Sequence, residues 1–479
     1  MRCTHLVVAT LICTLASAAD RLNRLNVVAL DPHGQPVTGL QSADLQLWED
    51  GKPRKIVFSR FTADKPLKPT SLGPGEYSNR ASAALRATVI VIDLLSDRMM
   101  SGSVIDQDIE HSLKNLESSE NVYLYFLTYR GELYPVHPLP KPDAEVTPAG
   151  EPWTRNIAPL LQAGLKNLFG IKPVDDRDIK VRFELTVNAL RDLGAQMRQV
   201  SGRKNLIWVT HGIPIYGFSI STQARMDFTY PLRQVCQELE QAQVVVYPVE
   251  QSMRGAGAAM GTESEQALQE FADLTGGRRY GSGRVDEALQ QAMTDFRANY
   301  QIAYYSASAK PDGKRHKLRV TCARKEVRLQ TEPGFYAVAS LNPPDDVERV
   351  ALEATTHSPF DATEIGLRAG VSPDSGAKGN MRLEIRIEAA DLLLRQAQDR
   401  RTGNISLWFV AYQAAGWGQP GPPIPLNISL TPEQYETVMH DGIELHRALP
   451  AGTAIRKVRA IVVDRELGTV GSITIPIQP

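Results

Sequence analysis

The sequence has few of the residue patterns that reveal an enzyme. Two of its four cysteines lie within the first 13 residues, so only Cys236 and Cys322 remain beyond them. This excludes a zinc site built from several closely spaced cysteines. The sequence also contains no HExxH, no GxSxG and no phosphate-binding loop motif. It therefore carries no signature of a zinc protease, a serine hydrolase or a nucleotide hydrolase.

An excess of one charge and long apolar runs are also missing. The formal net charge is −1, and acidic and basic residues are mixed along the chain. Such a balance indicates neither a nucleic-acid partner nor a membrane-surface partner. Beyond the first 20 residues no apolar run is long enough to span a membrane, so we expect no membrane insertion of the mature chain.

The first residues, "MRCTHLVVATLICTLASAAD", combine a basic Arg2, a short apolar run and the small residues 16–18. This pattern predicts a cleaved signal peptide, and hence a secreted or periplasmic protein. A membrane anchor is the alternative, but the apolar run is short for a hydrocarbon layer of about 30 Å. An oxidising compartment would allow Cys236 and Cys322 to form a disulfide. We favour two buried thiols instead, because these residues fall in a predicted helix and a predicted strand.

The chain alternates between α/β and all-β patterns. Within residues 85–299, β-branched runs such as "ATVIVID" lack polar alternation, and helical stretches separate them. Such runs indicate parallel strands that are buried on both faces and joined by crossover helices. Short alternating strands with turn signals lie before and after this segment. We therefore expect a multidomain α/β plus all-β protein, with a doubly wound, mostly parallel-sheet domain inserted in a β-sandwich and a C-terminal β-sandwich after it.

The domain boundaries follow from the same patterns. The N-terminal strands are too few to be stable alone, so we expect them to share one sandwich with strands that follow the α/β domain. Segments rich in Pro, Gly and Ser predict linkers. The expected parts are a signal peptide at 1–18, N-terminal strands at 19–62, a linker at 63–84, the α/β domain at 85–299, the strands completing the first sandwich at 300–340, a linker at 341–380 and the C-terminal sandwich at 381–479.

Several segments follow one another in a specific order, among them "VIVIDLLSD", "GRKNLIWVTHGIP", "FADLTGGRRYGSG" and "ANYQIAYYSA". In this order they resemble the von Willebrand factor A domain, in the form found in secreted acidobacterial proteins. The resemblance covers most of the mature chain. It implies a ligand face at the carboxyl ends of the parallel strands, where Asp93 ends the first of them.

The resemblance also implies a metal site, usually for Mg²⁺, built on an Asp-x-Ser-x-Ser loop and a later aspartate. Asp93 matches the first position of that loop, but Leu95 and Asp97 stand at its two serine positions. The later aspartate is replaced by His211, and imidazole is a poor ligand for a hard cation. We therefore expect no cofactor and expect Asp93 to accept backbone N–H bonds from the following turn. An Asp93–His211 pair is a further hypothesis.

The alternative is a degenerate Mg²⁺ site that uses the remaining oxygen ligands, namely Asp93, Ser96, Asp97 and Thr210. A long polar and aromatic loop follows on the same face. Its candidate contact residues are His211, Tyr216, Phe218 and Tyr230, since aromatic residues favour interfaces. The aromatic residues could equally well pack against the domain itself.

The resulting functional hypothesis is a non-enzymatic, adhesion-type module outside the cytoplasm that binds an unknown protein partner without a conventional metal site. An envelope scaffold or assembly factor, with the C-terminal sandwich making the contact, is the alternative. A hydrolase is a third class, and it would require a carboxylate pair or an activated serine at the strand ends.

Overall fold

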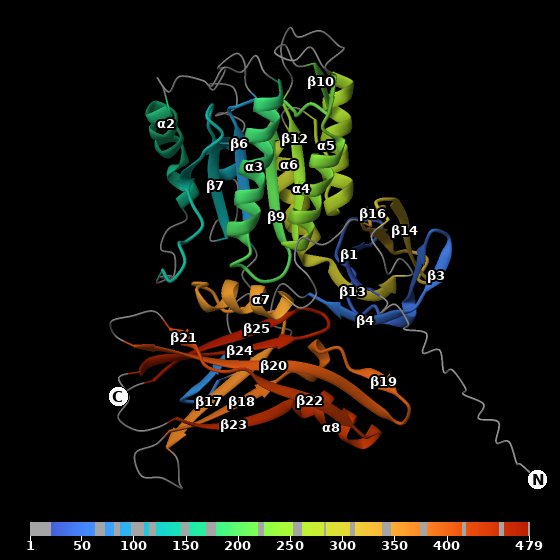
Figure 1. The fold of residues 1–479 in the computed structure, drawn as a ribbon, viewed down its shortest axis with the longest axis vertical. Helices are drawn as coiled ribbons and strands as arrows, with labels where there is room; N and C mark the ends of the chain where they lie inside the picture. The colour runs from blue at the N-terminus through green and yellow to red at the C-terminus, as the bar shows by residue number, and fades with distance from the viewer. Residues whose placement is uncertain are drawn as a thin grey trace, which may run out of the picture.

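The computed structural model describes most of the chain and shows three folded units (Figure 1). The described residues are 21–62, 72–80, 87–96, 110–114, 121–144, 153–168, 179–218, 225–251, 261–281, 284–306, 312–337, 346–373, 381–413, 418–449 and 455–477. The expected signal peptide at 1–18 lies outside these residues. Among the described helices, none combines the length and apolarity that a membrane span needs.

The α/β unit is built on a five-stranded sheet with the order β12-β9-β6-β7-β8. Its strands are β6 (Thr88–Asp93), β7 (Val122–Leu127), β8 (Leu133–His137), β9 (Lys204–Thr210) and β12 (Val244–Glu250). The first four in the sheet order are parallel, and β8 is antiparallel to β7. The β-branched run of β6 explains its central place, because Val89 and Val91 enter one apolar cluster and Ile90 and Ile92 enter another.

Helices cover both faces of this sheet (Figure 1). On the face of Val89 lie α3 (Ile179–Met197), α4 (Thr229–Gln241) and α5 (Gly261–Thr275). On the face of Ile90 lie α2 (Ile157–Leu168) and α6 (Val285–Arg297). A short hairpin of β10 (Tyr216–Phe218) and β11 (Arg225–Asp227) lies beyond the carboxyl end of β9.

The first β-sandwich combines strands from both sides of the α/β unit. One sheet has the order β15-β1-β13-β4 and the other has the order β16-β14-β2-β3. The strands are β1 (Arg21–Leu30), β2 (Leu45–Glu49), β3 (Lys52–Arg54), β4 (Ile56–Phe61), β13 (Asn299–Ser306), β14 (Arg315–Cys322), β15 (Arg328–Gln330) and β16 (Gly334–Tyr336). Their inward side chains form one apolar core, in which Leu25, Leu47 and Ile302 are fully buried.

The second β-sandwich pairs a sheet of order β23-β18-β17-β5 with a sheet built on β19-β20-β24-β25, in which β20 also pairs with β21 and β22. Its strands are β5 (Glu76–Ser78), β17 (Leu367–Pro373), β18 (Met381–Ile387), β19 (Arg395–Ala397), β20 (Arg400–Gln413), β21 (Gln419–Pro420), β22 (Ile424–Leu430), β23 (Ile443–Leu449), β24 (Ile455–Asp464) and β25 (Val470–Pro476). Helix α8 (Pro432–Asp441) joins β22 to β23, and α7 (Val347–Thr356) lies between this sandwich and the α/β unit (Figure 1).

Both segments expected to be linkers contribute to this second sandwich. Strand β5, from the expected linker 63–84, pairs with β17, from the expected linker 341–380. The side chain of Asn79 fixes this pairing, because its amide nitrogen donates to the carbonyls of Ala362 and Ile365 and its oxygen accepts from Leu367 N. The linker expectation is therefore corrected within 76–80 and 347–373, where polar residues make buried hydrogen bonds.

The two cysteines of the described residues are both free. Cys236 is buried in α4, as expected for a thiol in an apolar core. Cys322 ends β14 in the first sandwich and is only half-buried. The expectation of two buried thiols is thus correct for Cys236 and only partly correct for Cys322.

Candidate functional site

Asp93 and Thr210 end two neighbouring parallel strands, β6 and β9. The chain leaves these strands on opposite faces of the sheet. After β6, Leu113 packs into the cluster that holds Ile90, whereas α4, which follows β9, packs into the cluster that holds Val89. The two residues therefore flank the point where the strand order reverses, which is where open α/β sheets bind their ligands.

A closed network of hydrogen bonds joins the two strand ends. The Thr210 hydroxyl donates to Asp93 Oδ2 at 2.7 Å, and the backbone N–H of Ser96 donates to Asp93 Oδ1 at 3.0 Å. The Ser96 hydroxyl donates to the Asp93 carbonyl at 3.1 Å and accepts from His211 N at 3.0 Å. Gly212 N donates to Thr210 Oγ1 at 3.0 Å. Each oxygen of the Asp93 side chain thus has a protein donor.

Burial governs the electrostatics of this network. The Asp93 side chain is 1% exposed, and its desolvation raises the pKa of the carboxyl above the usual value. Hydrogen bonds from Thr210 and Ser96 and the charge of His211 act in the opposite direction. Because the pKa is raised on balance, removal from water outweighs these stabilising contacts.

The donor set does not fit the Mg²⁺ site that the sequence resemblance implies. A hard cation needs several oxygen ligands that are free to face it. Leu95, at the first serine position, is buried in the apolar cluster of α3, α4 and α5. His211 replaces the later aspartate, while the oxygens of Asp93, Ser96 and Thr210 bond to one another or to backbone N–H groups. Asp97 lies outside the described residues.

The hypothesised Asp93–His211 pair is not present among the described contacts. His211 approaches the network through its backbone N–H, and its ring atom Nδ1 is buried without a hydrogen-bond partner in the described structure. The Ser96 hydroxyl likewise contacts the backbone of His211 and not its imidazole. Among the described residues, the hydroxyl of Ser96 therefore contacts the Asp93 carbonyl, the Thr210 hydroxyl and the His211 backbone N–H.

The aromatic candidates divide into packing and exposed groups. Tyr216 is half-buried against the core and lies under the guanidinium of Arg225, whose Cζ is 5.5 Å from the ring centroid. Tyr230 is 63% exposed in the first turn of α4. Phe218 is the last residue of β10, and the environment of its side chain lies outside the described features. Tyr230 is therefore the exposed aromatic of this edge in the described structure.

Gly212 is a further residue of this edge, and its role depends on its backbone geometry. It has a φ of 108°, and a Cβ there would overlap the hydroxyl of Ser264 in α5. A glycine directly after a buried strand is a signal for such close backbone approach. Gly212 thus lets the loop after β9 turn tightly against α5.

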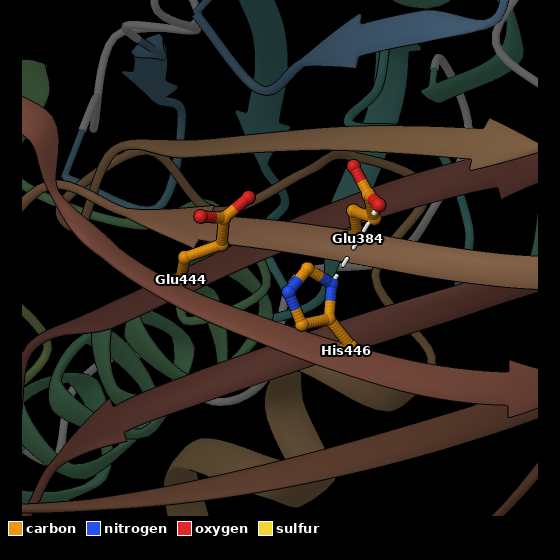
Figure 2. Close-up of side chains that lie close together, drawn as sticks. All are labelled: Glu384, Glu444 and His446. Carbon is orange, nitrogen blue, oxygen red and sulfur yellow. Dashed lines mark ion pairs between the residues drawn. The ribbon is translucent and has the colours of Figure 1, made fainter.

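A second group of polar side chains lies on the second sandwich (Figure 2). Glu384 of β18 lies opposite His446 of β23, and Glu444 lies two residues before His446 on the same strand. One ligand atom from each lies within 4.8 Å of the others. Arg382 and Arg386 already pair with the two carboxylates, so these cations compete with any metal ion.

Comparisons with known proteins give no identification. No known family matches the sequence, and no curated protein matches it. Two structures of the pilus adhesin SpaC from Lactobacillus rhamnosus GG align with 10% identity and TM-scores of 0.29 and 0.28. The alignments cover 92% of this chain but 58% and 61% of the adhesin chains, so this chain spans about three fifths of their length.

A third solved structure is the ArnB paralog VWA2 from Sulfolobus acidocaldarius. It aligns with 8% identity and a TM-score of 0.19, over 91% of this chain and 76% of that chain. Likenesses at this level do not establish a common fold or function.

Proposed function

We propose that this protein is a non-enzymatic, adhesion-type binding module related to von Willebrand factor A domains. Its partner is a protein, which binds outside the cytoplasm at the carboxyl edge of the five-stranded sheet. The observation that carries this proposal is the combination of Asp93 and Tyr230 at that edge. The Asp93 carboxyl is closed into hydrogen bonds, whereas the Tyr230 ring is exposed in the first turn of α4, in the chain segment that follows β9.

The strand order supports the relation to A domains. Parallel strands run through β12-β9-β6-β7, helices cover both faces, and the first strand of the unit ends in an aspartate. In this proposal the metal-dependent binding of those domains is absent, because Leu95 packs into the core and Asp93 accepts hydrogen bonds from the protein. Binding would instead use loop shape and exposed aromatic surface, which contribute strongly to protein interfaces.

A site-specific crosslinking experiment tests the proposal. A benzophenone amino acid is placed at Tyr230 or at Leu160 of α2, an exposed apolar control that is 37% exposed, and the protein is irradiated with isolated envelopes of the source organism. We expect a discrete adduct from position 230 only, with unchanged yield in EDTA. Equal adducts from both positions would overturn the loop-face proposal, and loss of the adduct in EDTA would overturn its metal-free part.

A third crosslinking position separates this proposal from the scaffold alternative. His440 of α8 is exposed on the second sandwich. An adduct formed there, with none at position 230, would contradict binding by the α/β unit and favour an envelope scaffold that is held through the second sandwich.

A further inference from the structure

The three units enclose a cavity of ≈ 380 Å³ at the end of the α/β sheet opposite to Asp93. Lys204 and Val244, which line it, are the first residues of β9 and β12. Strand β1, the turn before β16 and helix α7 supply other walls. The volume falls within the range of small-molecule sites, which commonly form between domains.

One wall of the cavity carries a buried acid, Glu332. Glu332 lies in the turn before β16, is 7% exposed, and makes no hydrogen bond or ion pair with any described residue. Desolvation and the charge of Glu240 raise the pKa of the Glu332 carboxyl well above its usual value. Its oxygens are not among the fully buried side-chain atoms without a partner, so the carboxyl is open to the cavity, where a hydrogen-bonding group of an occupant could reach it.

Cations gather on another part of the wall. Arg24 lies 3.7 Å from Glu364, but its Nη1 atom is buried without a hydrogen bond. Arg198 is half-buried and has no ion pair among the described residues. Lys204 is buried and donates to the Val200 carbonyl at 3.0 Å.

Burial and repulsion between these cations both lower the pKa of Lys204. Burial, together with the charges of Arg24 and Arg198, lowers the pKa of Lys204 to about 7, although Glu364 opposes the shift. Around Lys204, the cations Arg24 and Arg198 act together with one carboxylate, Glu364, while Glu240, Glu332, Glu466 and Arg233 also line the cavity. The local excess of cations around Lys204 would favour an anionic group of the occupant at that place.

Between the polar groups the wall is apolar. It is formed by side chains from all three units, including Leu25, Val200, Leu274, Phe335, Val350 and Phe360. Burying an apolar body against such a wall contributes about 25 cal/mol for each Å² removed from water. A free inorganic anion would gain nothing from it, whereas an organic acid would.

We propose that this cavity binds a small organic acid that has an apolar body and a second hydrogen-bonding group. The carboxylate would face Arg24, Arg198 and Lys204, and the second group would bond to Glu332. This site is independent of the proposed partner-binding face, because it lies at the opposite end of the sheet. Its occupant would contact all three units and hold them together.

Three matched probes test the chemistry by calorimetric titration of the mature protein. They are 3-(4-hydroxyphenyl)propionate, 3-phenylpropionate and the primary amide of the hydroxylated acid. We expect the hydroxylated acid to bind roughly tenfold more tightly than either analogue, since each analogue lacks one polar interaction. Inorganic phosphate, which has charge without an apolar body, should bind more weakly than all three. Absence of saturable binding by the three organic probes at millimolar concentration would overturn the proposal.

Variants then locate the site. Arg198→Gln should weaken binding of the acid roughly tenfold and leave the amide unchanged, whereas Arg456→Gln, at an exposed position of β24, should change neither. Glu332→Leu should remove the preference for the hydroxyl group. Ala354→Phe, which fills the cavity from α7, should abolish binding of all three probes. Unchanged affinities in Arg198→Gln and Ala354→Phe would contradict the assignment, and the Arg198 result decides if Ala354→Phe does not fold.

The test also separates this site from the proposed function. Tyr230→Ser should abolish partner crosslinking without changing the affinity for the acid. Loss of acid binding in Tyr230→Ser would place the acid elsewhere and overturn the cavity assignment.

Discussion

The Thr210 hydroxyl donates a 2.7 Å hydrogen bond to the buried carboxyl of Asp93, and this bond ties the end of β9 to the end of β6. A hydroxyl can reverse the direction of its hydrogen bond, whereas a backbone N–H cannot. The two oxygens of Asp93 therefore have different requirements. Oδ1 must remain an acceptor for Ser96 N, while the group at Oδ2 can be a donor or an acceptor.

This difference predicts the effect of changing Asp93. In Asp93→Asn the amide oxygen can still accept from Ser96 N, and the amide NH₂ can donate to Thr210, whose hydroxyl can turn toward Ser96 at 3.1 Å. We expect a free energy of unfolding within about 1 kcal/mol of wild type. Asp93→Ala leaves both donors unsatisfied and should cost about 1–3 kcal/mol. Urea unfolding of both variants, with and without Mg²⁺, measures this, and stabilisation of the wild type alone by Mg²⁺ would contradict the metal-free site.

The same substitution has a predicted pH dependence. Burial raises the pKa of Asp93 in the folded state above its usual value of 3.8. Between 3.8 and the raised pKa the folded protein binds more protons than the unfolded chain, so stability falls as pH rises through this window. Asp93→Asn removes that contribution. Its stability relative to wild type should therefore increase with pH there, and an opposite slope in denaturation curves would show that the carboxylate is stabilised.

The central strands could be predicted from the sequence because they carry strong local patterns. The β-branched run that ends at Asp93 is buried on both faces, and the Asp50-Gly51 pair, a typical turn sequence, forms the tight hairpin between β2 and β3 with positive φ at both residues. Strand β5 could not be predicted, because it has three residues and pairs with β17, almost 300 positions later. Its polar neighbour Asn79 is a typical loop residue until that distant strand supplies its partners.

The sequence predicts which positions of the candidate site differ from the metal loop that the resemblance implies, but it does not predict the contacts that the site makes. Leu95 and His211 stand in the sequence at two positions where the resemblance implies metal ligands. The role of Thr210 as the donor to Asp93 depends on the register between β6 and β9, which the sequence does not specify. The cavity was missed entirely, since Arg24, Lys204 and Glu332 come from segments that meet only after all three units are folded.

Asp464 provides a contrasting prediction in the second sandwich. Its Oδ1 accepts from Glu466 N and Leu467 N, and its Oδ2 accepts from Leu393 N at 2.8 Å. In Asp464→Asn the amide NH₂ would face a backbone N–H that cannot reverse. We expect a loss of about 1–3 kcal/mol of stability, in contrast to the small effect of Asp93→Asn. Parallel urea titrations of the two variants make the comparison, and equal losses would show that hydroxyl reversal is not the cause.

Gly212 is expected to tolerate no side chain. Its φ of 108° is unfavourable for any other residue, and a Cβ would lie 2.8 Å from Ser264 Cβ. Gly212→Ala should therefore cost about 1–3 kcal/mol through backbone strain and steric overlap. Gly370→Ala in β17 is the matched control, because a Cβ there meets nothing within 4 Å. Thermal unfolding compares them, and a Gly212→Ala midpoint as high as that of Gly370→Ala would show that the loop can move away from α5.

Lys204 makes the stability of the protein depend on pH near neutrality. Burial is the main cause that lowers its pKa from 10.5 to about 7, and Arg24 and Arg198 add to the shift while Glu364 opposes it. Between these two pKa values the unfolded chain binds more protons than the folded protein, so stability should rise with pH. Lys204→Met keeps the length of the side chain and removes this dependence. The free energy of unfolding of Lys204→Met, measured relative to that of wild type, should be more favourable at pH 6 than at pH 9 by on the order of 2 kcal/mol.

Denaturant titrations of wild type and Lys204→Met at pH 6, 7, 8 and 9 measure that difference. Lys52→Met, at an exposed position of β3, removes the same charge without relieving burial and should follow the wild-type profile. A Lys204→Met profile parallel to wild type would mean that the ammonium group stays charged in the folded protein throughout this range. In that case the anion-binding part of the cavity would carry three permanent cations, and the affinity of the organic acid should then be independent of pH over the same interval.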